Sequence, residues 1–297
     1  MEILRFFESI RTPFLTNAFS FITSLGEEYV FIILALVFIW CVDKRTGYLI
    51  LISGIIGELV NQILKISFQT ERPWITHSDF AAVKSAIPEA VGFSFPSGHT
   101  QIAATTYSII GIKYKKYKAL SVLSFALIFL IGISRLYLGV HYPSDVIFSL
   151  AFGLLLSFIV FYTFKKENFA IYRWICFGLS AISVLWVLFC SVGKLDNEVY
   201  SASLDTIGKF FGATAGFLVA WIIDEKKINF KTEGSIFFQI LKITIGVALV
   251  FVSRALLKEL FETIRINVYV ADSIRYFLIV FVGGAVWPYF FSKISKK

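Results

Sequence analysis

Two histidines stand beside residues that could give them a chemical role. His141 precedes Asp145 by four residues, with Pro143 between them. Proline is favoured at a helix start, so the aspartate falls in a first helical turn, where it can hydrogen-bond one imidazole nitrogen. The other nitrogen is then free to act as a nucleophile. His99 can give a proton to a leaving oxygen and later activate water, since the histidine pKa is about 6.5. The candidate catalytic residues are therefore His141, His99 and Asp145.

Cationic and amide-rich positions supply what an anionic group would need. Lys65, Arg72 and Arg135 offer three positive charges, and the two arginines present planar forks suited to phosphate oxygens. Neutralising those oxygens is most of what phosphoryl transfer requires of a protein. Ser97 and Gly98 precede an expected helix, whose exposed amides and positive dipole end bind anions. These five are the candidate phosphate-binding residues, and no metal-ligand set is indicated.

Each residue taken alone has a more ordinary explanation. Lysines and arginines at the ends of membrane spans usually anchor the helix, and an interfacial histidine is usually a packed polar residue. The combination is different, because Ser134, Arg135, His141 and Asp145 at fixed spacing are expected by chance in under about one in a hundred such chains.

Three segments together resemble the signature of the type 2 phosphatidic acid phosphatase superfamily. They read Lys65-x6-Arg72-Pro73, Pro96-Ser97-Gly98-His99 and Ser134-Arg135-x5-His141-x3-Asp145. That family includes lipid phosphate phosphatases, undecaprenyl-diphosphate phosphatases, glucose-6-phosphatase and the vanadium haloperoxidases. The resemblance spans roughly residues 25–165. It implies a cofactor-free, metal-independent phosphatase that works through a phosphohistidine, with His141 as nucleophile, Asp145 as its orienting partner and His99 as acid and base.

The composition indicates the kind of protein that must position these residues. Of the 297 residues, 57% are hydrophobic and only 16% are charged, with a mean hydropathy of +0.77. Ordinary soluble domains are roughly 45–50% apolar and about 25% charged. The net charge of +8 lies in short clusters between apolar blocks. No basic stripe follows a soluble face, so nucleic-acid binding is not expected.

Hydropathy predicts an all-α, polytopic membrane helix bundle with about nine spans. The expected spans are near residues 29–42, 47–68, 98–112, 119–138, 144–164, 171–192, 204–223, 236–257 and 274–291. Alternate loops and the C-terminal tail carry 15 of the 28 lysines and arginines. The positive-inside rule therefore predicts a cytosolic C-terminus, an N-terminus outside, and all three motifs on the extracytoplasmic face.

The whole chain is expected to form a single membrane domain. Residues 1–25 are predicted to form an amphipathic helix at the membrane surface, with packing on the bundle as the alternative. Residues 26–165 would form the catalytic core, and residues 166–297 would add spans of unknown role. In the seventh span, glycines at every fourth position favour close packing inside the chain, with an oligomer interface as the alternative. They are Gly208, Gly212 and Gly216.

The leading functional hypothesis is a phosphatase that acts on a lipid phosphate or diphosphate at the outer face of a bacterial plasma membrane. Phosphatidate, an isoprenyl diphosphate, a sphingoid phosphate and phosphatidylglycerophosphate are all compatible substrates. An endoplasmic reticulum location would place the same face in the lumen. Two alternatives stay open, a phosphatase of a soluble sugar phosphate and a transporter of lipids or anions. Transport, however, does not require His141 and Asp145 beside His99.

Overall fold

The protein is described by a computed structural model. The structure describes residues 1–164, 174–182, 185, 198–264 and 268–294. Every regular element in these ranges is a helix, which confirms the predicted all-α class. The chain divides into two compact units, Met1–Ile32 with Leu49–Lys166 and Ile33–Tyr48 with Glu167–Lys297. The single membrane domain with its three segments stays a prediction.

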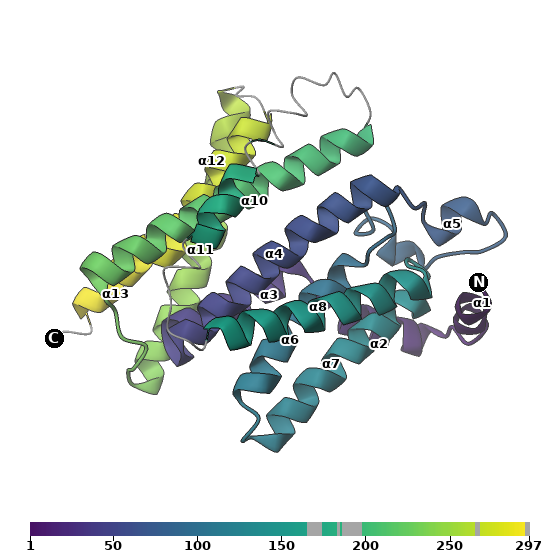
Figure 1. Ribbon diagram of the computed structural model, residues 1–297, viewed down its shortest axis with the longest axis horizontal. Helices are drawn as coiled ribbons and strands as arrows, with labels where there is room; N and C mark the ends of the chain where they lie inside the picture. The colour runs from purple at the N-terminus through teal and green to yellow at the C-terminus, as the bar shows by residue number, and fades with distance from the viewer. Residues whose placement is uncertain (165–173, 183–184, 186–197, 265–267, 295–297) are drawn as a thin grey trace. The chain divides into compact units, whose positions relative to one another are not determined.

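Seven of the described helices lie wholly within the first unit, and they include α6, α7 and α8 of the predicted motifs (Figure 1). They are α1 (Glu2–Ser9), α2 (Pro13–Ser24), α5 (Pro73–Thr76), η2 (Lys84–Ala86), α6 (Gly98–Lys113), α7 (Lys118–Tyr137) and α8 (Pro143–Phe164). Two further helices, α3 (Glu28–Val37) and α4 (Lys44–Phe68), run from one unit into the other. Short turns join α6 to α7 and α7 to α8, and α6 packs against both. The start of α6, the end of α7 and the start of α8 therefore lie at the same end of the unit.

Small and polar residues let α6 pack closely against its neighbours. A Cβ on Gly153 of α8 would come within 2.6 Å of the Ala104 Cβ on α6, so only glycine permits this approach. The side-chain amide nitrogen of Gln101 on α6 donates to the Gly57 carbonyl, and the Asn61 side chain donates to Gln101 Oε1 at 3.0 Å. These bonds join α4 to α6 and fix the end of α4 that carries Lys65.

The N-terminal helices pack on α7. The Phe19 ring stacks on Tyr137 with centroids 4.3 Å apart, and Arg11 donates to the Tyr137 carbonyl at 3.2 Å. Arg5 pairs with Asp79 in the loop after α5. The single amphipathic helix predicted over residues 1–25 is thus two helices, α1 and α2, which rest on protein along at least one face. Their place at the membrane surface stays a prediction.

The second unit is built from long apolar helices. Its elements are η1 (Phe38–Val42), α10 (Glu198–Ile223), η3 (Asp224–Ile228), α11 (Ile236–Thr263), α12 (Val268–Phe281), η4 (Val282–Val286) and α13 (Trp287–Ile294). α10 lies against α12. A Cβ on Gly212 or Gly216 would collide with backbone atoms of Ser273 or Phe277 on α12. Packing inside the chain, the preferred interpretation of these glycines, is confirmed at both positions.

The protein is an integral membrane protein. Within the described ranges, six helices are long and apolar enough to cross a membrane, or seven if the bent pair Pro13–Ser24 and Glu28–Val42 forms one span. α6 has 16 residues, which is shorter than the roughly 20 that a typical span needs. The predicted span near 171–192 falls mostly outside the described residues. Nine spans and their orientation therefore stay predictions.

Candidate active site

His141 lies in the turn between α7 and α8, where it is buried. Its Nδ1 is 3.4 Å from an Asp145 carboxylate oxygen, and its Nε2 is 3.0 Å from a guanidinium nitrogen of Arg72. A guanidinium can only donate, so a neutral imidazole in this place accepts at Nε2 and carries its proton on Nδ1. The free lone pair of the neutral ring is therefore on Nε2, and the Nδ1 proton faces the carboxylate.

Burial keeps this imidazole uncharged. It lowers the pKa of His141 well below the usual 6.5, and the positive charges of Arg72, Arg135 and Lys65 lower it further. A neutral imidazole is the reactive form of a histidine nucleophile. His141 is thus in the form that its predicted role as a nucleophile requires.

Asp145 is held in the first turn of α8 by three donors. Ser94 donates its hydroxyl to the carboxylate at 2.6 Å, and the Tyr142 amide donates at 2.9 Å. The Ser144 hydroxyl reaches the second oxygen at 3.2 Å. Asp145 can therefore hold the orientation of the His141 ring, as the sequence predicts. Ser94 has no counterpart in the sequence analysis, because nothing in its spacing links it to Asp145.

Arg72 ties three segments of the site together. Its guanidinium donates to the carbonyls of Val91, Gly92 and Val140 at 2.9, 3.1 and 2.9 Å. The nitrogen that faces Val140 also faces His141 Nε2. A phosphate brought up to Nε2 would meet this nitrogen directly, so Arg72 is placed to bind an oxygen of the group under attack.

Arg135 and Lys65 complete the positive charge. Arg135 is buried at the end of α7, where it donates to the Thr23 hydroxyl at 2.7 Å. Its Nε is buried with no hydrogen-bond partner among the described residues, so one strong donor is still available. The Lys65 charge, on the last turn of α4, interacts with those of Arg72 and Arg135.

The start of α6 provides the backbone part of the site. The Ser97 amide approaches the Asp145 carbonyl at 3.4 Å, which ties the start of α6 to that of α8. Apart from the neighbouring residues of its own helix, no heavy atom in the described part of the chain lies within 4 Å of where a Gly98 Cβ would stand, so the helix end is open to a ligand at that residue. The first amides of a helix form an anion site. The Nε2 of His99 is buried with no partner among the described residues, as suits a group that waits for a substrate atom.

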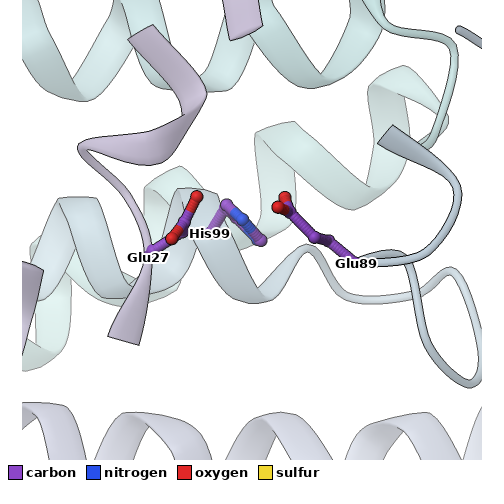
Figure 2. Close-up of side chains that lie close together, drawn as sticks. All are labelled: Glu27, Glu89 and His99. Atoms are coloured by element: carbon purple, nitrogen blue, oxygen red, sulfur yellow. The ribbon is translucent and has the colours of Figure 1, made fainter. Parts of the chain in front are cut away.

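Two carboxylates that the sequence analysis does not single out lie beside His99. Glu27 comes from the turn between α2 and α3, and Glu89 comes from the loop after η2 (Figure 2). One ligand-type atom from each of the three side chains lies within 4.8 Å of the others. The eight predicted site residues all belong to the first unit, and the contacts above bring them together at one end of it. Their individual roles stay predictions.

Comparison with known families decides the assignment. A model of the PAP2 superfamily matches residues 46–169, and a model of the PAP2 superfamily phosphatase transmembrane extension matches residues 208–297. Phosphatidylglycerophosphatase B of Bacillus subtilis is 35% identical over 166 residues, which are 51% of this chain and 76% of that protein. The chain belongs to the PAP2 superfamily. The PAP2 match contains all three motifs. The extension match covers most of residues 166–297, to which the sequence assigns no role.

Other PAP2 relatives differ in what their names describe. The bacitracin transport permease protein BcrC of Bacillus licheniformis is 32% identical over 52% of this chain and 82% of its own length. The undecaprenyl-diphosphatase BcrC of Bacillus subtilis is 34% identical over 37% of this chain and 53% of its own length. The names of the relatives thus include both a monoester and a diphosphate as substrates.

Proposed function

We propose that this protein is a membrane lipid phosphatase that removes the terminal phosphate of a lipid phosphate or lipid diphosphate at the extracytoplasmic face through a phosphohistidine on His141. The observation that carries the proposal is the buried imidazole whose Nε2 lone pair points at Arg72 while its Nδ1 proton faces Asp145. Membership of the PAP2 superfamily and the lipid phosphatases among the relatives support the same reaction class.

The first half-reaction forms the phosphohistidine. The phosphoryl oxygens bind Arg72, Arg135, Lys65 and the first amides of α6, which neutralise their charge. His141 Nε2 attacks phosphorus in line, so a P–N bond forms as the P–O bond to the lipid breaks. His99 gives its proton to the departing oxygen, and the alcohol leaves uncharged.

The second half-reaction returns the enzyme to its starting state. Water attacks the phosphohistidine, and His99 takes a proton from it. The P–N bond breaks, orthophosphate leaves and His141 is again neutral. No step calls on a metal ion, because the positive charge that phosphoryl transfer needs comes from the two arginines and the lysine.

The charge distribution along the helices supports the proposed membrane side. α6 runs from Gly98 in the site to Lys113, and α7 runs from Lys118 to Arg135 in the site. The basic residues at the ends opposite the site are placed on the cytosolic side by the positive-inside rule. Cysteines placed at Ser85 and Lys115 in a cysteine-free background test this. An impermeant maleimide on intact cells should label the first and not the second, and the reverse pattern would overturn the orientation.

An aromatic row beside the site favours a lipid over a soluble sugar phosphate. Phe95 precedes the Pro96-Ser97-Gly98-His99 segment, and its ring lies 5.0 Å from that of Phe68 and 4.9 Å from that of Phe148. The row continues along α8 to Phe152, whose ring is 5.9 Å from that of Phe148. Phe68 is 62% exposed. Apolar rings that leave the site along a membrane helix suit an acyl or isoprenyl chain.

Phosphate release by the purified protein in detergent and EDTA tests the proposal. The panel contains phosphatidic acid, phosphatidylglycerophosphate, sphingosine phosphate, undecaprenyl diphosphate and glucose 6-phosphate. We expect release from a lipid substrate and its loss in His141→Ala. Release from glucose 6-phosphate alone would replace the lipid with a soluble sugar phosphate.

Transport is the second candidate, because one relative is named a transport permease. The same variant separates the two functions. Liposomes that contain His141→Ala should show neither phosphate release nor any effect on lipid movement if the protein is a phosphatase. Lipid flux that survives the substitution would favour the transporter.

A further inference from the structure

Glu27 and Glu89 are set against His99 by ordered parts of the first unit. Glu27 follows Gly26, and a Cβ on that glycine would stand 3.0 Å from the His99 carbonyl oxygen and 2.8 Å from a methyl group of Ile131. The same turn is fixed to α6 by the Tyr107 hydroxyl, which donates to the Leu25 carbonyl at 2.8 Å. The absence of a side chain at Gly26 is what lets the turn bring Glu27 to His99.

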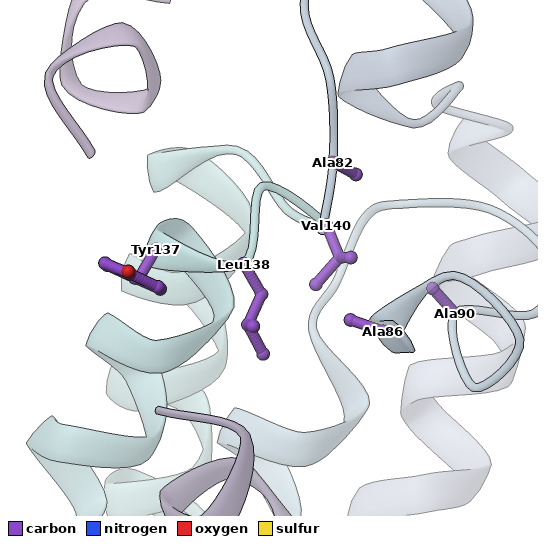
Figure 3. Close-up of a cluster of buried hydrophobic side chains, with 6 residues drawn as sticks. All are labelled: Ala82, Ala86, Ala90, Tyr137, Leu138 and Val140. Carbon is purple, nitrogen blue, oxygen red and sulfur yellow. The ribbon is translucent and has the colours of Figure 1, made fainter. Parts of the chain in front are cut away.

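The Glu89 loop is anchored on both sides. Ala86 and Ala90 are buried in a cluster that also contains Ala82, Tyr137, Leu138 and Val140 (Figure 3). On the other side, Arg72 holds the Val91 and Gly92 carbonyls. The arginine predicted to bind phosphate therefore also fixes the backbone just after Glu89. The backbone next to each glutamate is therefore fixed by contacts within the first unit, and the Glu89 side chain itself is exposed.

The two carboxylates give the site an uneven charge. Arg135 interacts electrostatically with both of them, and their side-chain oxygens lie near a ring nitrogen of His99. A phosphate group bound by Arg72, Arg135 and Lys65 lies in a region of positive charge. A group bonded to that phosphate on the His99 side meets two negative charges. The leaving group occupies that side if His99 is the proton donor.

We infer that Glu27 and Glu89 select substrates whose leaving group is uncharged, which makes lipid phosphomonoesters preferred over lipid diphosphates. The inference rests on the proposed function. In a monoester, the P–O bond breaks, the oxygen takes the His99 proton and a neutral alcohol departs. In a diphosphate, the departing group is a lipid phosphate that keeps negative charge, and the carboxylates repel it in the transition state.

Matched isoprenyl monophosphate and isoprenyl diphosphate substrates of one chain length test the inference. The measured quantity is the ratio of kcat/KM for the diphosphate to kcat/KM for the monophosphate. In the wild type this ratio should lie well below one. Glu27→Gln and Glu89→Gln should each raise it about tenfold, which corresponds to about 1.4 kcal/mol of removed repulsion. High salt should raise the wild-type ratio, because it screens the repulsion.

Glu71→Gln is the matched control, because it removes the same charge from an exposed residue between α4 and α5 that is outside the group of Glu27, Glu89 and His99. It should leave the ratio unchanged. An unchanged ratio in Glu27→Gln and Glu89→Gln, or an equal rise in Glu71→Gln, would overturn the inference while phosphatase activity stands. Wild-type protein that releases phosphate from neither isoprenyl substrate and from none of the other lipids in the panel above would overturn the proposed function, and this inference with it.

Discussion

Replacement of Ser94 by alanine tests the idea that Asp145 works only when it is held still. Ser94 Oγ is buried and lies 2.6 Å from the Asp145 carboxylate. This is the shortest of the three hydrogen bonds that the carboxylate accepts. Hydrogen bonds to charged groups contribute about 1.5–3 kcal/mol, or roughly tenfold to 150-fold in rate if the full loss reaches the transition state. Because the Tyr142 and Ser144 donors stay in place, we expect a loss near tenfold.

The loss should appear in kcat more than in KM, because Ser94 contacts the partner of the nucleophile and none of the phosphate-binding groups. Purified Ser94→Ala is assayed by steady-state phosphate release. A thermal unfolding curve then shows that the variant is folded. Ser144→Ala is the control, because its hydroxyl lies 3.2 Å from the other oxygen and is the weaker donor. It should lose less than about threefold. Full activity in Ser94→Ala, or an equal loss in both variants, would refute the reasoning.

Three further predictions follow from the same geometry. Burial and nearby cations lower the pKa of His141, so its neutral form persists below pH 6.5. The fall of kcat/KM toward acid pH should therefore begin below pH 6.5. A fall that begins at or above pH 6.5 would contradict the role of neutral His141 as nucleophile. Gly98→Ala places a methyl group in open space, so the unfolding temperature should hold or rise while kcat/KM falls about tenfold or more; unchanged activity would show that phosphate does not approach there. In Arg72→Lys the ammonium group cannot make the contacts that the guanidinium makes with three carbonyls and His141. Activity should therefore fall about 100-fold or more. A loss under fivefold would show that Arg72 does not bind the phosphate.

The residues that the sequence identifies at the site share one property. Each belongs to a short segment whose spacing has a local meaning, such as His141 four residues before Asp145 or Gly98 at a helix start. Local spacing is visible in a single chain because helix geometry converts it directly into position. The structure then brings the three segments together through contacts of Arg72 and the Ser97 amide.

The residues that the sequence misses act across long separations. Ser94 meets Asp145 from 51 residues away. Glu27 reaches His99 only because a glycine turn between α2 and α3 is pressed onto α6. A lone serine or glutamate in a connecting segment has no pattern that points to such a partner. These contacts become visible only in the three-dimensional structure.

The N-terminal helix shows why an amphipathic pattern is ambiguous. Its apolar and charged faces fit a membrane surface and a protein surface equally well. The pairing of Arg5 with Asp79 and the bond from Arg11 to the Tyr137 carbonyl show one face on protein. Phe6 and Phe14 are 59% and 80% exposed, so apolar surface is still available for lipid.

Direct capture of the phosphorylated enzyme tests the central claim. Protein mixed with a lipid phosphate that carries radioactive phosphorus is quenched in alkali, which preserves phosphohistidine, and the label is mapped by peptide sequencing. We expect label on His141 in the wild type and no label in His141→Ala. Label on another residue, or steady turnover by His141→Ala, would contradict the account.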